Sequence, residues 1–293
     1  MEFRESELII NQDGSIFHLH LFPEDIADDI ILVGDPGRVE VVASFFDNIE
    51  LKKQNREFYT ITGSFNGKRI SVISTGIGTD NIDIVVNELD ALSNIDLKTR
   101  TRKKDHRTLN LIRIGTSGAL QADIPVDSFL MSKRSIGFDG LLNFYKDRNR
   151  VSDLDFEFAF KYHVQWNHLL ASPYVVDASE MLIKKLEGDD MRKGITISAP
   201  GFYGPQGRQL RLPIVDENIN DKIESFELDG QKITNYEMES SAIFGLSNLM
   251  GHNAITICAI IANRPLGEYS KDYKPVIKNL IEIILNRLTN NNE

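Results

Sequence analysis

The stretch Leu-Asn-Leu-Ile-Arg-Ile-Gly-Thr-Ser-Gly-Ala-Leu, residues 109–120, decides the fold of this chain. Its apolar and β-branched residues predict a buried strand. Arg113 lies inside that strand, and because a guanidinium keeps its charge, burying it requires an anionic partner. The turn predicted over residues 115–118 offers backbone N–H groups and two hydroxyls, which suit an anion bound at the end of a strand. A core carboxylate beside Arg113 and an ordinary turn explain these residues equally well.

Length and composition indicate a soluble protein with a sizeable core. The chain has 293 residues and neither a linker nor a repeat, so we expect a single domain over residues 1–293. A net charge of -10 argues against nucleic acid and anionic membranes as partners. No apolar run approaches the ~20 residues that span a bilayer, and the N-terminus has no signal-like segment. The single cysteine, Cys258, rules out an intramolecular disulfide and suits a reducing compartment, so we expect a cytoplasmic location.

Two predicted strands end in a cation, at the edge where α/β sheets bind ligands. Arg38 follows the strand 30–33 and the turn Gly34-Asp35-Pro36-Gly37, and Arg264 follows the strand 254–262, which is predicted to be fully buried. Turn chemistry of this kind is found in any protein. The added cation is what indicates an anion-binding end.

A Gly/Pro-rich loop follows the strand predicted over residues 195–198. It carries Phe202, Gln206 and Arg208. An aromatic ring, an amide and a guanidinium can together stack on a flat ring and hydrogen-bond its edge. In most proteins a Gly/Pro-rich loop only connects two elements. The functional hypothesis therefore depends on the aromatic and polar residues of this loop.

The rest of the chain predicts alternating strands and helices. Asn66-Gly67 between two apolar runs is the strongest short hairpin signal, and a 3.6-residue apolar stripe marks the helix that follows it. The polar, basic stretch 94–107 is expected to be a solvated inserted loop rather than a contact site. The other strands expected are 58–65, 69–74 and 128–136. The helices expected are 39–46, one carrying Ile82 to Leu92, 154–166, one capped by Asp177 or Ser179 that runs to Leu186, one that begins at 235–240, and 273–288.

Two short segments leave alternatives open. His18 and His20 alternate with apolar residues, but no nearby carboxylate or cysteine completes a metal site, so the segment either reaches a neighbouring subunit or forms an edge strand. Glu239 lies at the start of a predicted helix, where a carboxylate either complements the helix dipole or accepts hydrogen bonds from ligand hydroxyls.

Eight stretches together resemble the nucleoside phosphorylase family, and within it the uridine phosphorylase branch. They are Phe17-His-Leu19, Gly34-Asp-Pro-Gly-Arg38, Arg56-Glu-Phe58, Ser74-Thr-Gly-Ile-Gly78, Arg113-Ile-Gly-Thr-Ser-Gly118, Phe202-Tyr-Gly-Pro-Gln-Gly-Arg208, Tyr236-Glu-Met-Glu-Ser240 and Ile261-Ala-Asn-Arg264. They run in family order across almost the whole chain. The resemblance implies an α/β fold: one domain with a central mixed, partly barrel-like β-sheet flanked by helices, assembled as a homodimer or a trimer of dimers.

The resemblance also implies a role for each matching position. The phosphate-binding positions are Gly34, Arg38, Arg113 and Thr116, with Arg56 reaching in from the adjacent subunit. The nucleoside-binding positions are Thr116, Glu237, Met238 and Glu239 near the ribose, His18 lent by the neighbour to the 5′-hydroxyl, and Phe202, Gln206 and Arg208 at the base with Arg264 behind them. The catalytic positions among these are Arg208, Gln206, Arg113 and Glu239. An interfacial monovalent cation, K+ for example, would be bound by Glu57, Ile70 and Ser74.

The activity implied is phosphorolysis of uridine by inorganic phosphate, which acts as co-substrate, with no cofactor. Several arginines directed at one anion suit phosphate as the nucleophile, because guanidinium groups hold it bidentately. Purine-specific relatives carry a proton-donating aspartate in the place of Asn263, and an amide cannot supply a proton. The alternatives are a phosphorylase with another nucleoside preference, for thymidine, deoxyuridine or purine nucleosides, and a catalytically silent nucleotide-binding relative.

Overall fold

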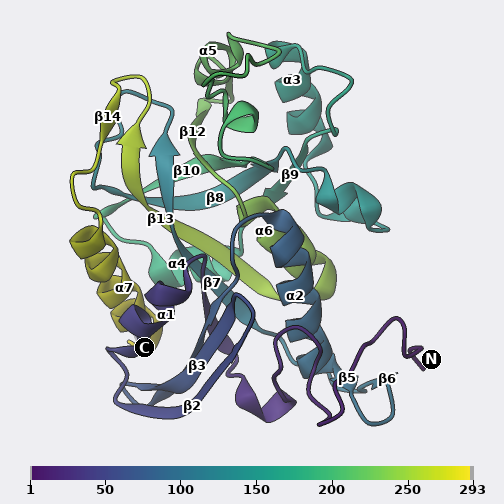
Figure 1. The fold of residues 1–293 in the computed structure, drawn as a ribbon. Coiled ribbons are helices and arrows are strands. Elements are labelled where there is room, and N and C mark those ends of the chain that lie inside the picture. The colour runs from purple at the N-terminus through teal and green to yellow at the C-terminus, as the bar shows by residue number, and fades with distance from the viewer. Residues whose placement is uncertain (1, 291–293) are drawn as a thin grey trace.

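Strand β7 (Asn110–Ala119) lies at the centre of a large mixed sheet in the computed structural model, which describes residues 2–290 (Figure 1). It runs parallel to β1 (Asp29–Val33) on one edge and to β13 (Asn253–Asn263) on the other. Continuous apolar character is expected of parallel strands that are covered on both faces. The buried strand predicted from residues 109–120 is therefore confirmed.

The sheet closes on itself at one end and stays open at the other. Its strand order is β11-β12-β10-β8-β13-β7-β1-β4-β3-β2, with β9 beside β8 and β14 beside β13. Because β12 also pairs antiparallel with Gly118 and Ala119 of β7, strands β7, β13, β8, β10 and β12 form a closed ring. The predicted α/β fold with a mixed, partly barrel-like sheet is confirmed. The other strands are β2 (Asn48–Asn55), β3 (Phe58–Phe65), β4 (Lys68–Ser74), β5 (Ile95–Asp96), β6 (Thr101–Arg102), β8 (Phe129–Gly137), β9 (Tyr174–Asp177), β10 (Met191–Ser198), β11 (Glu227–Leu228), β12 (Gln231–Glu237) and β14 (Glu268–Tyr269).

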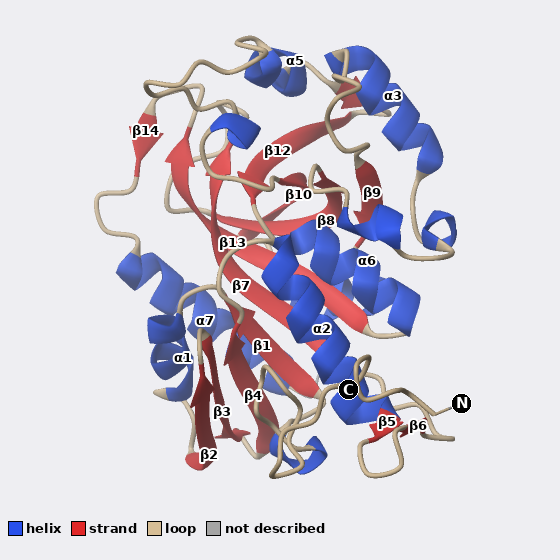
Figure 2. Ribbon diagram, turned by 45° about the vertical axis from the view of Figure 1, so that its right-hand side comes forward, coloured by secondary structure: helices blue, strands red, loops and turns tan. Residues whose placement is uncertain are grey.

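Helices cover both faces of the sheet. Figure 2 shows α2 and α6 side by side over one face, with α1 and α7 together on the opposite side and α3 and α5 above the closed end. Among residues 2–290 no helix combines the length and the apolar character needed to cross a membrane. The helices are α1 (Pro36–Ala43), α2 (Thr79–Asn94), α3 (Leu154–Val164), α4 (Glu180–Leu186), α5 (Ile219–Glu224), α6 (Ser240–Met250) and α7 (Lys274–Thr289), with short 3-10 turns at Pro23–Asp25, Leu141–Phe144, Arg148–Arg150 and Gly204–Gln206.

The turn predicted over residues 115–118 is wrong, because these residues continue β7 and pair with β13. The ladder uses the backbone N–H groups that face β13, so the expected anion-binding turn does not form. Gly115 has a packing role instead: a Cβ there would lie 2.0 Å from Nη1 of Arg113, whose side chain lies over the glycine. A glycine-rich sequence that resembles a turn also suits a strand crossed closely by a long side chain.

The helix predicted to begin at residues 235–240 begins later, at Ser240, because β12 occupies the preceding residues. Two polar side chains of this missed strand have partners on β10 inside the barrel. Thr234 donates to the carbonyl of Ile195 at 2.8 Å, and Asn235 accepts from the Thr196 hydroxyl at 2.8 Å. These hydrogen bonds offset part of the cost of burying an asparagine, which is rare in strands.

The stretch 94–107 is a small hairpin rather than a plain loop. β5 and β6 pair within it, and Lys103 donates to the carbonyls of Leu92 and Ser93 at 3.2 and 3.0 Å. A cation at the last carbonyls of α2 stabilises that helix end. One charge of the basic stretch therefore has a structural role.

Candidate active site

A gap in the sheet opens beside β7. Pairing with β1 stops at Arg113 and pairing with β12 begins at Gly118, so residues 114–117 have no strand neighbour on that edge. A cavity of about 1100 Å³ opens next to this edge. The predicted site residues that line it are Gly34, Arg38, Arg113, Thr116, Phe202, Gln206, Arg208, Glu237, Met238 and Glu239, together with Glu57.

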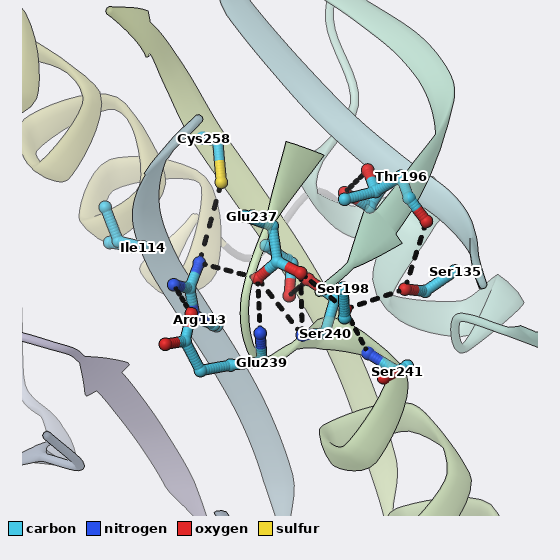
Figure 3. A network of polar contacts seen from close by, with 12 residues as sticks. Arg113, Ile114, Ser135, Thr196, Ser198, Glu237, Glu239, Ser240, Ser241 and Cys258 are labelled. Carbon is cyan, nitrogen blue, oxygen red and sulfur yellow. Dashed lines mark hydrogen bonds and ion pairs between the residues drawn. The ribbon is translucent and has the colours of Figure 1, made fainter. Parts of the chain in front are cut away.

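Arg113 has two carboxylates as partners at the floor of the cavity (Figure 3). Its Nη2 donates to Glu239, and its Nη1 lies 3.3 Å from Glu237 and 3.6 Å from the Cys258 sulfur. All three charged side chains are buried. The anionic partner that Arg113 requires is thus present within the chain, and the triad keeps one negative charge in excess. Burial raises the pKa of Glu239, Arg113 opposes that rise, and the like charge of Glu237 adds to it.

The two glutamates have different surroundings. Glu237 accepts from the backbone N–H groups of Glu239 and Ser240, each at 3.0 Å, and from the Ser198 hydroxyl at 2.5 Å. It therefore complements the start of α6, a role considered for Glu239 from the sequence. Glu239 reaches across the cavity floor and accepts from the backbone N–H of Gly78 at 2.8 Å.

Arg38 lies at one end of the cavity without an ion-pair partner among residues 2–290. It lies in the first turn of α1, which Asp35 caps by accepting from the Gly37 N–H at 2.9 Å. Its Nη1 donates to the carbonyl of Ile114 on the open edge of β7 at 3.3 Å. Burial, followed by the positive charge of Arg113, lowers the pKa of Arg38. An anion bound here would relieve both effects.

The other end of the cavity holds Phe202, Gln206 and Arg208, as predicted. The Arg208 guanidinium lies over the Phe202 ring, 3.9 Å from its centroid, and donates to the Phe202 carbonyl at 2.6 Å. Arg264 lies behind Gln206 and donates to its backbone carbonyl. Burial lowers the pKa of Arg208 and, with the added repulsion of Arg208, lowers the pKa of Arg264 to about 10. Neither arginine has a carboxylate partner in the part of the chain that the structure describes.

Gln206 is buried and its orientation is determined by the two arginines. Arg208 and Arg264 both direct N–H groups at its side-chain oxygen, the second at 3.0 Å. Because guanidinium groups only donate, the amide oxygen must face them and the amide nitrogen must face away. The NH2 group of Gln206 is therefore available as a donor to a ligand in the cavity.

Residues 28–286 match the family model described as the phosphorylase superfamily. The chain belongs to this superfamily. It is similar to the uridine phosphorylase of Thermococcus kodakarensis, at 29% identity over 92% of this chain and 85% of that protein. It is also similar to the DeoD-type purine nucleoside phosphorylase of Listeria welshimeri, at 28% identity over 83% and 85% of the two chains. The crystal structure of a Trypanosoma brucei nucleoside phosphorylase that shows uridine phosphorylase activity superposes with a TM-score of 0.86 at 28% identity, over 96% of this chain and 99% of that one.

The uridine phosphorylase and the purine nucleoside phosphorylase are about equally similar to this chain. Particular residues must therefore indicate whether this superfamily member acts on pyrimidine or purine nucleosides. Asn263 is buried and bonds to the backbone. Its NH2 donates to the carbonyls of Gln121 and Ile124 at 3.1 and 2.8 Å, and its oxygen accepts from the Leu266 N–H at 3.1 Å. This amide is thus fully engaged in anchoring two loops, and it neither lines the cavity nor offers a proton.

His18 and Arg56 lie together, outside the cavity of their own chain. The Phe17 ring contacts His18 edge-on with centroids 4.6 Å apart, and the Arg56 guanidinium lies 6.0 Å from the Phe17 centroid. His18 is held by Glu88, whose carboxylate accepts from its ring nitrogen at 2.6 Å and from its backbone N–H at 3.0 Å. In this superfamily member the two positions that the resemblance assigns to a neighbouring subunit therefore form one exposed corner.

Sequence reasoning missed several residues of the cavity. The segment Tyr269–Lys274, which returns from β13 through β14 to the start of α7, lines it, as do Ser117 and Tyr236. The hydroxyls of Ser117, Tyr236 and Ser270 are buried and have no hydrogen-bond partner within residues 2–290. Unpaired buried polar atoms are rare in native proteins. A ligand in this cavity could supply the missing partners of these three hydroxyls.

Proposed function

We propose that this protein is a uridine phosphorylase, which cleaves uridine with inorganic phosphate to uracil and ribose 1-phosphate in pyrimidine salvage. One observation carries the proposal: Arg38 at one end of a single cavity, and Arg208 at the other with Arg264 behind it, have no carboxylate partner among the described residues. A nucleophilic anion and an anionic leaving group are the two charges that this arrangement would stabilise.

At the anion end, phosphate would be held by Arg38 and by the Thr116 hydroxyl beside the open edge of β7. Glu239 and Met238 lie next to this position and would hold the ribose, with the Glu239 carboxylate accepting from ring hydroxyls. Binding the two reactants side by side replaces a bimolecular encounter with a single oriented step. The protein would therefore accelerate the reaction by positioning, without a covalent intermediate.

At the base end, negative charge grows on uracil as the glycosidic bond lengthens. Arg208 and the NH2 group of Gln206 would stabilise that charge through hydrogen bonds to the base edge. Loss of uracil as an anion requires no proton donor at this stage. A purine is a better substrate where an acid protonates the ring, and Asn263 cannot do so.

The decisive experiment is the absorbance change of uridine in the presence and absence of phosphate. We expect cleavage only with phosphate, and much slower cleavage of inosine. Absence of cleavage, or cleavage at the same rate in phosphate-free buffer, would refute the proposal. Faster turnover of inosine than of uridine would instead support the purine nucleoside alternative suggested by the DeoD-type relatives.

Arg38→Ala is expected to raise the KM for phosphate by roughly 10- to 100-fold, because a charge-assisted hydrogen bond contributes about 1.5–3 kcal/mol. The KM for uridine should change much less. Steady-state kinetics with each substrate varied in turn measure both. Arg192→Ala is the matched control, since Arg192 pairs with Asp123 on the surface and should alter neither value. An unchanged KM for phosphate in Arg38→Ala would place the anion elsewhere.

We also propose that two copies share each site, as a dimer or a trimer of dimers, with His18 and Arg56 of one copy completing the cavity of the other. Their shared position outside their own cavity supports this. Mixing Arg56→Ala with Arg208→Ala and allowing subunits to exchange should restore about a quarter of the wild-type activity. Half of the dimers are then mixed, and each mixed dimer has one intact site. Absence of recovery after confirmed exchange would mean that each chain works alone.

The cation implied at Glu57, Ile70 and Ser74 does not fit within one chain. Ile70 and Ser74 are four residues apart in β4, roughly 13 Å along a strand. The Ser74 hydroxyl donates to the backbone carbonyl of Glu57 at 2.5 Å and accepts from the Tyr59 N–H at 2.8 Å. An ion would need ligands from two copies, so we derive no step of the reaction through it. For the whole protein we propose a cytoplasmic location, which its single, buried thiol suits.

A further inference from the structure

Tyr236 carries a buried hydroxyl that no group in the described chain satisfies. Only 2% of the residue is exposed, and the hydroxyl has no hydrogen-bond partner within residues 2–290. The ring borders the cavity at its base end and packs edge-on against Phe138, with centroids 6.3 Å apart. Leaving a buried hydroxyl unpaired is unfavourable, so a tyrosine retained in place of phenylalanine needs a further partner.

Tyr174 shows how the same fold treats a tyrosine with a purely structural role. It is also completely buried, but its hydroxyl lies 2.9 Å from the Asp139 carboxylate and 3.0 Å from the Ser241 hydroxyl. The protein therefore satisfies one buried phenol internally and leaves the other, the one beside the cavity, without a partner. This contrast points to a partner that arrives in the cavity.

The groups around Tyr236 determine what that partner must be. The Arg264 guanidinium lies 4.8 Å from the ring centroid, and its Nε is likewise buried without an acceptor. Burial raises the pKa of Tyr236, and the positive charges of Arg264 and Arg208 oppose that rise without cancelling it, so the hydroxyl stays protonated near neutral pH. Guanidinium groups cannot accept hydrogen bonds. Donors therefore predominate around the Tyr236 hydroxyl, and an acceptor atom suits this part of the cavity best.

We infer that the Tyr236 hydroxyl donates a hydrogen bond to a carbonyl oxygen of the nucleobase, which makes Tyr236 a base-specificity residue. The inference rests on the proposed function. A ring carbonyl would satisfy the unpaired proton of Tyr236, whereas a ring amino group at the same position would leave that proton without an acceptor and would face the guanidinium donors nearby. The site would therefore favour oxo-pyrimidines over amino-pyrimidines, because the wrong base leaves buried donors unpaired.

Tyr236→Phe tests the inference because it removes the hydroxyl and keeps the ring. We expect kcat/KM for uridine to fall by roughly 10- to 100-fold. We expect the same variant to bind uracil about tenfold more weakly in calorimetry, and its melting temperature not to fall. Tyr174→Phe is the matched control: it deprives Asp139 and Ser241 of a partner and should lower the melting temperature.

Thio-substituted uridines identify the carbonyl, since sulfur is a weak acceptor. The loss caused by Tyr236→Phe should nearly disappear for either 2-thiouridine or 4-thiouridine and remain for the other. An unchanged kcat/KM with unchanged uracil binding, an equal loss for all three nucleosides, or a fall in melting temperature like that of Tyr174→Phe would overturn the inference. Failure of the wild-type enzyme to cleave uridine would refute the proposed function instead, and uracil binding would still test the role of Tyr236.

Discussion

Arg113→Met should lower the free energy of unfolding by about 3–5 kcal/mol, the usual cost of removing one partner from a buried ion pair. Arg113 lies between Glu239 and Glu237, and both carboxylates are buried. Methionine fills much of the same space but provides no charge, so two ionised groups would remain close together without a counter-ion. Urea unfolding of the wild type and the variant at one pH measures the difference, and activity should be lost as well.

The pH dependence of this effect has a defined sign. Burial already raises the pKa of Glu239 above its unfolded value, and loss of Arg113 would raise it further. The folded variant then binds a proton more readily than the unfolded chain, so its destabilisation is full above the folded pKa of Glu239 and shrinks as pH falls through that value. Unfolding curves between about pH 8 and about pH 5 should show the two proteins converging.

The double variant Arg113→Met/Glu239→Gln separates charge from packing. Glutamine keeps an oxygen for the Gly78 N–H and removes one of the two charges. Glu237 can remain ionised, because the first N–H groups of α6 stabilise it. The double variant should therefore recover much of the lost stability. Equal instability of the single and double variants would mean that packing, not charge, explains the loss.

Local patterns in the sequence predicted the architecture where one signal dominated. The Asn66-Gly67 hairpin, the apolar stripe of α2 and the buried strand of residues 109–120 are all confirmed. The predictions failed where tertiary contacts reverse the local preference. The local sequence around Gly115 predicts a turn, but Gly115 lies in a strand and accommodates the Arg113 side chain. The sequence around Asn235 predicts a helix start, but Asn235 is hydrogen-bonded to β10 inside the barrel. The pairing of residues 115–118 with β13 and the contact of Asn235 with β10 join positions far apart in the chain, so a local window of sequence shows neither.

The same distinction applies to the site. Cations at strand ends could be predicted, because parallel strands bring their carboxyl ends to one edge. Arg38, Arg208 and the buried glutamates accordingly meet in one cavity. The segment Tyr269–Lys274 was missed because its position over the cavity depends on the antiparallel pairing of β14 with the end of β13, which no local signal in the sequence indicates. Tyr236 was missed because its significance is the lack of a partner, which only coordinates reveal.

Arg208→Ala is expected to lower kcat for uridine by about 100- to 1000-fold, comparable to the loss of one donor from an oxyanion hole. Arg208 stacks on Phe202 at the base end, has no carboxylate partner in the described chain, and also fixes the amide of Gln206. Its charge is therefore free to stabilise the departing base. Arg211→Ala, three residues along the same loop and exposed, is the matched control and should leave kcat unchanged.

A leaving-group series distinguishes this role from simple binding. If Arg208 stabilises the negative charge that develops on the base, it should matter less when the base carries that charge more easily. The ratio of wild-type to Arg208→Ala kcat should then be smaller for 5-fluorouridine, whose base is the better leaving group, than for uridine. Equal ratios for the two nucleosides, with KM alone raised, would assign Arg208 to ground-state binding. Intact turnover of uridine by Arg208→Ala would remove Arg208 from the mechanism.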